Sequence, residues 1–463
     1  MHPSSPGETA DRNSGRLFVQ VPIDSLVAFR VWLGMMMMLD VASYFRNKWI
    51  DSVFIEPAFL FKYYGFEWIH PWPGAGMYLH FAALLILAGC MTLGLFYRVT
   101  SLLFATGITY VFLLEQAIYL NHLYLICLLS WLIVFVPCHC SFSLDVLRNP
   151  SLQSSVAPAW SLWLIRFQVG LPYFFGGIAK LERDWLSGDT VHMFFYDDAA
   201  RPIVGPYLTE NWVIMSISWG GMLLDLLIVP LLLWRRTRPY AFVAAVLFHL
   251  SNSYLFNIGI FPWMMIGATT IFFSPDWPRR LFRWPSRDEC PMEITPSIRW
   301  PRLVISSLLA VYVLVQLALP LRQFAYPDNP SWSEEGHRFS WRMMLRKKIT
   351  KVEVLVVDEE SGRKGKFDPH EVLTPMQAQK MSRSPDMLLQ FAHYLERRFR
   401  EQGMGGIAVH IHDRVSLNGR EAQLLIDPSV DLTEQQRSFR HAEWIIPLDE
   451  DAPSLMRQVA RKN

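Results

Sequence analysis

Lys180 is the residue of this chain with the clearest potential for chemistry. It is the only lysine between Lys62 and Lys347, and it directly follows the apolar run PYFFGGIA. A lysine at the end of a membrane-spanning helix usually extends its amine to the membrane surface as an anchor. In a dry pocket without a carboxylate partner, burial instead favours the uncharged amine, which can accept a proton as a general base. The residue alone supports both interpretations.

Two histidines are predicted to lie at the same depth as Lys180. His122 follows Asn121 at the start of one apolar segment, and His249 lies near the outer end of another. A single histidine in such a segment is more often a packed core residue, whereas three titratable groups at one level favour a site. The sequence offers no Gly-rich phosphate loop, HExxH motif or Ser-His-Asp arrangement as a competing site. The chemistry predicted from these residues is proton transfer in a dry pocket.

The composition places this pocket in a membrane protein. The chain has 463 residues, of which 52% are hydrophobic and 18% charged, and its net charge is +2. These values indicate several membrane spans with a soluble part, and they give no reason to expect a nucleic-acid partner. Residues 1–20 are predicted to form a disordered tail without a cleavable signal segment. Cys138, His139 and Cys140 look like a metal-binding fragment but lack a second ligand pair, so no metal is predicted.

The predicted fold class is a polytopic α-helical membrane protein with a C-terminal α+β extracytoplasmic soluble domain. The membrane domain is predicted to cover residues 21–322. The connection at 45–73 alternates aromatic and charged residues, which is typical of an interfacial or re-entrant segment. About nine apolar segments have close to the roughly 20 residues that a bilayer requires, at 24–44, 75–97, 99–119, 121–140, 159–180, 212–234, 239–255, 257–274 and 302–322.

Arginines predict the orientation of these spans. With a cytoplasmic N-terminus, the loops after the second, fourth, sixth and eighth spans lie inside, and they carry Arg98, Arg148, a cluster at 235–238 and a basic loop at 279–302. Positive charge in short loops marks the cytoplasmic side. The end of the fifth span, which carries Lys180, then faces the same compartment as the C-terminal domain. That compartment is the periplasm, the cell exterior or the lumen of the endoplasmic reticulum.

Residues 323–463 are predicted to form the soluble domain. Short runs at 352–357, 407–412 and 423–426 have the pattern of strands, and 374–401 has the pattern of a helix. Together they indicate a small α+β domain.

Charged side chains within the predicted spans are costly to bury, so they are expected to form ion pairs and hydrogen bonds that fix the bundle. They are Arg30, Asp40, Glu115, Arg166 and Asp225. Asp184 would lie one turn after Lys180 on a continuous helix and would keep the amine charged. If Lys180 is a base, the helix must break or turn near Arg183.

Several segments, in the same order along the chain, resemble those of vitamin K-dependent gamma-glutamyl carboxylases. GGIAKLERDW, preceded by PYFF, resembles the family segment that carries the catalytic lysine. VFLLEQAIYLNHLYL, FHLSNSYLFNIGIFPW and FFSPDWPRRL resemble membrane segments of the family, and FSWRMMLRKK and LLIDPSVDL resemble segments of its soluble domain. Animal members continue beyond the end of this chain and carry an extracytoplasmic cysteine pair. The resemblance is therefore to a shortened, bacterial-type relative.

The resemblance implies a reaction. A peptidyl-glutamate carboxylase adds carbon dioxide to protein glutamate, giving gamma-carboxyglutamate, and couples this to epoxidation of reduced vitamin K, or another naphthohydroquinone, by oxygen. Lys180 matches the base that deprotonates the hydroquinone, and the oxygenated quinone then removes the γ-proton of glutamate. Water would quench these species, so the site must be dry. The implied partners are a glutamate-containing protein or peptide, the lipid bilayer and a quinone reductase.

The resemblance also implies roles for individual residues. Lys180 and His122 match catalytic positions. The positions implied in hydroquinone binding are Asn121, Tyr173, His249, Met343 and Met344. The positions implied in substrate binding are Trp341, Arg346, Lys348 and Arg420.

Another class of function remains open from the sequence, namely a non-carboxylating quinone-binding or transport protein of the same superfamily. A pure transporter would not need the C-terminal domain. The internal symmetry of transporters built on inverted repeats is also absent from the sequence.

Overall fold

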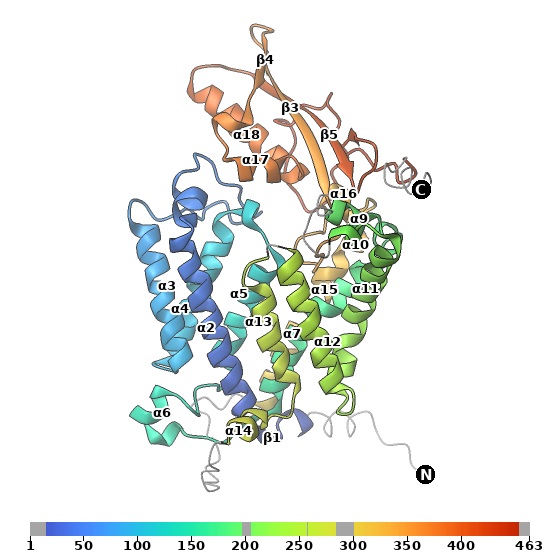
Figure 1. Ribbon diagram of the computed structural model, residues 1–463. Coiled ribbons are helices and arrows are strands. Elements are labelled where there is room, and N and C mark those ends of the chain that lie inside the picture. The colour runs from blue at the N-terminus through green and yellow to red at the C-terminus, as the bar shows by residue number, and fades with distance from the viewer. Residues whose placement is uncertain (1–14, 197–204, 257, 284–300, 453–463) are drawn as a thin grey trace, which may run out of the picture.

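The chain folds into a helical bundle with a sheet-containing domain on one end (Figure 1). The computed structural model describes residues 15–196, 205–256, 258–283 and 301–452. Three sequence predictions fall partly outside these ranges. They concern the N-terminal tail up to residue 14, the middle of the basic loop at 284–300, and the end of the C-terminal domain from residue 453.

Within the described residues, six helices are long and apolar enough to cross a bilayer, which makes the chain a polytopic membrane protein. They are α2 (Asp24–Arg46), α3 (Gly76–Leu93), α4 (Tyr97–Leu114), α7 (Ala159–Ala179), α11 (Asn211–Leu233) and α15 (Arg302–Leu321). The other three predicted spans are also helical in the described part of the chain. These are α5 (Asn121–Phe135), α12 (Arg238–Leu255) and α13 (Phe261–Thr269). Because α5 and α13 are shorter than a bilayer requires, a total of nine crossings stays a prediction.

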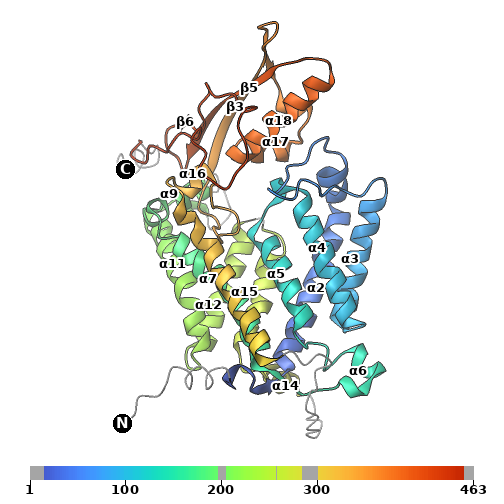
Figure 2. The ribbon, with the colours of Figure 1, turned by 180° about the vertical axis from the view of Figure 1, so that it is seen from behind.

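The bundle packs closely where glycines remove side chains. A Cβ atom added at Gly177 of α7 would lie only 2.9 Å from the backbone nitrogen of Leu226, so α7 and α11 approach each other more closely than larger residues would allow. α15, by contrast, runs along the outside of the bundle (Figure 2), and most of its surface is exposed.

Two arginines within the bundle bind backbone carbonyls rather than carboxylates. Arg30 is fully buried and donates hydrogen bonds to the carbonyls of Cys138 at 2.8 Å and Phe142 at 2.6 Å. Arg166 donates to the carbonyls of Ile271 and Phe273, both at 2.9 Å. These contacts tie helix ends to neighbouring loops, where carbonyl groups lack helical partners. The arginines thus fix the bundle as predicted, through hydrogen bonds.

Glu115 does not lie within a span, contrary to the sequence prediction. α4 ends at Leu114, and Glu115 follows it as a buried residue at the junction of the two domains. Its carboxylate accepts hydrogen bonds at 2.8 Å from the backbone of Ala117 and from the side chain of Gln377 in the C-terminal domain. The segment at 45–73 reaches the same junction, since the backbone of Lys62 donates to Gln390 at 2.7 Å. This segment and Glu115 support the C-terminal domain.

The C-terminal domain contains a four-stranded antiparallel sheet in the order β4-β3-β5-β6, as an α+β fold requires. The predicted helix at 374–401 is divided in two, because Pro385 begins a new helix after a short break. Both helices lie beside the sheet in Figure 1. The elements are β3 (Lys348–Asp358), β4 (Lys364–Phe367), α17 (Pro375–Met381), α18 (Pro385–Glu401), β5 (Ile407–Leu417) and β6 (Gln423–Leu424).

A candidate active site around Lys180

Lys180 lies at the end of α7, where the helix stops. α7 ends at Ala179, Lys180 forms its C-terminal cap, and a separate short helix, α8 (Arg183–Leu186), begins three residues later. The break that a base at Lys180 requires is therefore present. Asp184 on α8 is bound elsewhere: its two oxygens lie 2.5 and 2.6 Å from the guanidinium nitrogens of Arg420. Asp184 does not neutralise Lys180.

A different carboxylate pairs with Lys180, so the condition of an amine without a carboxylate partner is not met. The Lys180 Nζ atom lies 2.6 Å from the Oδ2 atom of Asp225 on α11, and both side chains are buried. Asp225 therefore does form an ion pair within the bundle, as predicted, but it forms that pair with the candidate base. The amine also lies 5.1 Å from the ring centre of Trp185.

Three side chains converge at Gly176, which has no side chain of its own. A Cβ atom at this position would lie 3.3 Å from Met343 Cε, 3.4 Å from Asp225 Oδ2 and 3.8 Å from Lys180 Nζ. Met343 belongs to the C-terminal part of the chain, so this part reaches down to the ion pair. Met343, which the resemblance implies in hydroquinone binding, thus lies close to Lys180, and its role in binding stays a prediction.

The two histidines belong to a second group, which includes Tyr173 of α7 and lies apart from Lys180; His122 is on α5 and His249 on α12. The Tyr173 hydroxyl lies 2.6 Å from His249 Nε2 and 3.1 Å from the Thr269 hydroxyl. The ring of Phe261 lies between the two histidines, stacked on His122 at 5.4 Å and edge-on to His249 at 6.1 Å. Tyr173 is seven residues before Lys180, so it projects from a similar side of α7 two turns away. Among the described residues, no hydrogen bond or ion pair joins Lys180 to either histidine.

A strained segment of the C-terminal part lies above these groups. Phe339, Trp341 and Met344 have φ angles of 65°, 56° and 58°, in the left-handed region that side chains other than glycine rarely adopt. Such strain persists only where the surroundings hold it, and it is common at functional sites. Trp341 is almost fully buried and packs on Tyr124 of α5, with ring centres 5.1 Å apart. Sequence reasoning could not detect this backbone conformation.

Asn121 fixes the strained segment to the bundle. Its side-chain nitrogen donates to the carbonyl of Arg342 at 2.9 Å, and its oxygen accepts from Tyr119 at 2.9 Å. The Tyr119 hydroxyl in turn accepts from the backbone of Phe339 at 2.6 Å. Asn121 was implied in hydroquinone binding, and the structure assigns it a direct contact with the segment that carries Met343.

Asn121→Ala should reduce carboxylation by roughly tenfold or more without unfolding the protein, because a lost hydrogen bond that leaves a buried carbonyl unpaired costs about 1–3 kcal/mol. The measurement is the initial rate of carbon dioxide fixation alongside a thermal unfolding curve. Tyr119→Phe is a second test of the same network, since it removes the hydroxyl that links Asn121 and Phe339. Unchanged rates in both variants would contradict a holding role for this contact.

Arg346 and Lys348, implied in binding the substrate carboxylate, share one carboxylate of the protein. Arg346 Nη2 lies 2.8 Å from one Glu334 oxygen and Lys348 Nζ lies 3.0 Å from the other. The Lys348 amine also donates to the carbonyls of Trp332 at 2.5 Å and Arg383 at 2.9 Å, so its three N–H groups are all used. Burial lowers the pKa of Lys348 to about 8, against the attraction of Glu334.

Arg346 is the better placed of the two for a ligand. Its side chain is 25% exposed, compared with 1% for Lys348. Within the described part of the chain, its Nη1 atom is buried and has no hydrogen-bond partner. Arg420, the third implied cation, is already paired with Asp184 and nearly buried. The structure thus gives Arg420 a contact between domains in place of a free guanidinium.

Asp413 on β5 is a buried carboxyl group that sequence reasoning missed. It is fully buried, and neither oxygen has a hydrogen-bond partner among the described residues. Burial raises its pKa to about 8, while the nearby charge of Lys348 opposes the shift. Its position in a strand of otherwise apolar buried residues gave no sequence signal beyond the alternation of the strand.

Asp413→Asn should stabilise the protein increasingly between pH 6.5 and 8. The folded-state pKa lies above the unfolded one, so the wild type loses stability as pH rises toward 8, by about 1.4 kcal/mol per pH unit. Two other buried groups make stability rise with pH, but outside this window. The depressed pKa of His337 has this effect below pH 6.5, and the depressed pKa of Lys348 has it only above about pH 8. Denaturant unfolding of both proteins at three pH values measures the difference. A pH-independent difference would show that Asp413 is already ionised when folded.

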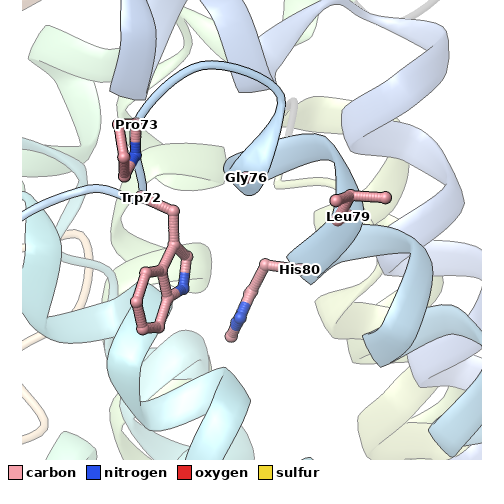
Figure 3. A pocket seen from close by; sticks show the side chains of 5 residues that line it. All are labelled: Trp72, Pro73, Gly76, Leu79 and His80. Carbon is pink, nitrogen blue, oxygen red and sulfur yellow. The ribbon is translucent and has the colours of Figure 1, made fainter.

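Two hollows on the outer surface of the bundle are separate from these residues. One, of about 360 Å³, is lined by Trp72, Pro73, Gly76, Leu79 and His80, and Figure 3 shows the indole of Trp72 beside the imidazole of His80. The other, of about 590 Å³, shares Trp72 and extends to Tyr110 and Trp131. None of the predicted site residues lines either hollow.

One group of described residues has the composition and spacing to hold a metal ion. Asp328, Glu335 and His441 each offer one ligand atom, all within 4.8 Å of one another. His441 Nδ1 and Glu335 Oε2 already lie 2.8 Å apart as a hydrogen-bonded pair. None of the three belongs to the predicted site.

Comparison with protein families matches both parts of the chain. Residues 18–277 match the HTTM domain, and residues 301–451 match the vitamin K-dependent gamma-carboxylase lumenal domain. No solved structure matches the chain. The first match covers more than half of the sequence, and the second covers the part that contributes Met343 to the Lys180 region. The chain belongs to the gamma-glutamyl carboxylase-like family of HTTM-domain membrane proteins.

Proposed function

We propose that the protein is a vitamin K-dependent peptidyl-glutamate carboxylase. It converts glutamate, hydroquinone, oxygen and carbon dioxide into gamma-carboxyglutamate, quinone epoxide, water and one proton. The observation that carries the proposal is the buried amine of Lys180, which lies at the end of α7 against Met343 from the carboxylase-family part of the chain. A pure transporter has no need for this contact.

Lys180 acts as the base in this proposal. It accepts a phenolic proton of the bound hydroquinone, a naphthohydroquinone such as reduced vitamin K, which supplies the reducing power of the reaction. Burial of the amine keeps bulk water away from the reacting atoms. The amine lies inside the bundle, 2.6 Å from Asp225 of α11 and close to Met343 of the C-terminal part, rather than on a lipid-facing surface.

Tyr173, His249 and His122 would line the face of the hydroquinone. Their rings form a connected aromatic group with Phe261, and the Tyr173 hydroxyl and the His249 imidazole supply polar atoms within it. A planar apolar ligand with polar ends matches a pocket of this kind. His122, which the family resemblance implies as catalytic, is only half-buried and would contact the ligand from α5.

Arg346 would hold the substrate carboxylate, since it alone of the three cations implied in substrate binding has a buried N–H group without a hydrogen-bond partner among the described residues. The substrate is a glutamate-containing protein or peptide that approaches from the C-terminal domain. We place this domain on the extracytoplasmic side and the N-terminus in the cytoplasm, from the arginine distribution and the lumenal name of the matching family. A separate quinone reductase would regenerate the hydroquinone.

The test uses the detergent-solubilised full chain with reduced vitamin K, labelled bicarbonate and a glutamate-containing peptide. We expect labelled carbon dioxide in the peptide and quinone epoxide in equal amounts. Oxidised quinone in place of the hydroquinone is the control and should give neither product. Absence of both products across several hydroquinones and peptides would overturn the proposal in favour of a quinone-binding or transport protein.

A further inference from the structure

The ion pair between Lys180 and Asp225 poses a problem for a base. The amine and the carboxylate lie 2.6 Å apart, at 5% and 3% exposure, and each is held by a different helix of the bundle. Lys180 also donates weakly to the carbonyl of Gly176 at 3.4 Å. An ammonium bound in this way already carries its full set of protons and cannot accept another. A base role therefore requires that one proton leave Nζ before the hydroquinone reacts.

The pair contains its own acceptor for that proton. Asp225 is the only carboxylate within hydrogen-bond distance of Nζ among the described residues. Burying two charges costs several kcal/mol per ion, and this cost is largest when water is excluded. Moving one proton along the existing hydrogen bond turns two charges into a neutral amine and a neutral carboxyl group. A bound ligand that excludes water therefore favours the neutral form of the pair.

We propose that Asp225 is the residue that frees Lys180 to act as a base, an inference that rests on the proposed function. One proton passes from Lys180 Nζ to Asp225 Oδ2 as the ligand excludes water, leaving an uncharged amine. That amine then takes one phenolic proton from the hydroquinone. After both transfers Asp225 is neutral, Lys180 carries one positive charge and the ligand one negative charge, so protons and net charge balance.

The structure also explains why the carboxyl group comes from α11. Gly176 and Gly177 let α11 approach α7 closely, and Asp225 is adjacent to Leu226, the residue in contact with Gly177. Met343 covers the same point from the C-terminal part of the chain. Packing on three sides holds the carboxyl group against the amine, which makes the transfer path short and fixed.

The decisive comparison is the epoxidation rate of Asp225→Asn. The amide can still accept a hydrogen bond from Lys180 but cannot take its proton. We expect the maximal rate to fall by roughly 100-fold or more, within the usual range for a lost acid or base, with little change in the KM for the hydroquinone. Asp225→Glu should recover part of the rate. Leu226→Val is the matched control, because it alters the same helix contact without changing a carboxylate.

The opposite outcome would overturn the inference. If Asp225 only holds Lys180 in its charged form, removing the carboxylate frees the amine, and Asp225→Asn keeps or exceeds the wild-type rate. A thermal unfolding curve identifies a variant that has merely failed to fold.

Infrared difference spectra of the wild type with and without oxidised quinone provide a readout independent of turnover. We expect a band from a protonated carboxyl group to appear on binding, and Asp225→Glu should shift it. No such band would overturn the inference even in a fully active enzyme. If the wild type produces neither epoxide nor carboxylated peptide, the proposed function fails while this spectrum still reports on Asp225.

Discussion

Lys180→Arg should eliminate both carboxylation and epoxidation in a protein that remains folded. Arginine keeps the positive charge opposite Asp225 but is not deprotonated in proteins, so it preserves the ion pair and removes the base. The expected loss is about 100- to 10,000-fold in the maximal rate of both products. The measurement is the rate of epoxide formation together with carbon dioxide fixation, alongside a thermal unfolding curve.

This substitution also distinguishes the two roles considered for the lysine. An anchoring lysine would tolerate arginine, because either side chain extends a charge to the membrane surface. Lys180→Met is a second variant, which leaves Asp225 buried without a partner and is expected to lose both activity and stability. Activity in Lys180→Arg close to that of the wild type would contradict the base role and favour a purely structural ion pair with Asp225.

The sequence pointed to the candidate base more clearly than to the residues that form ion pairs around it. Lys180 was identifiable because it stands alone in a long apolar region, and its helix break was anticipated from the position of Asp184. The pairs with Asp225 and Arg420 join residues far apart in the chain, and no local pattern predicts such contacts. Sequence reasoning thus selected Lys180 as a candidate base but did not predict that its amine pairs with Asp225.

The sequence could likewise predict some helix boundaries but not others. The break before Pro385 follows from the chemistry of proline and could have been predicted from the sequence. The end of α4 before Glu115 could not, because apolar residues continue past it and the turn depends on contacts of Glu115 with Phe61 and Gln377, which are distant in the sequence. The left-handed backbone of Trp341 and Met344 is equally invisible in a sequence, since neither residue type favours it.

Asp184 and Arg420 are expected to be essential for the junction between the bundle and the C-terminal domain. Their carboxylate and guanidinium groups meet through two hydrogen bonds of 2.5 and 2.6 Å, and both side chains are buried. Asn418 adds a donor to the same carboxylate at 2.9 Å. Because Asp184 follows Lys180 by only four residues, this contact also fixes the segment that leaves the candidate base.

Asp184→Asn should therefore destabilise the protein by about 3–5 kcal/mol, the usual cost of leaving one member of a buried ion pair without its partner. Arg420→Gln should cost a similar amount. The double variant should be more stable than either single one, because no buried charge remains unpaired. Denaturant unfolding followed by tryptophan fluorescence measures these differences, and the carboxylation rate of each variant reports on Lys180.

Glu353→Gln provides a matched control for this series, because it breaks an exposed ion pair with Lys366 on the surface of the sheet. Exposed pairs contribute about 0–1 kcal/mol, so the control should unfold like the wild type. If Asp184→Asn behaves like this control, the junction does not depend on the buried pair. If instead it unfolds early while the double variant recovers stability but not activity, the charged pair is needed to position Lys180 as well as to join the domains.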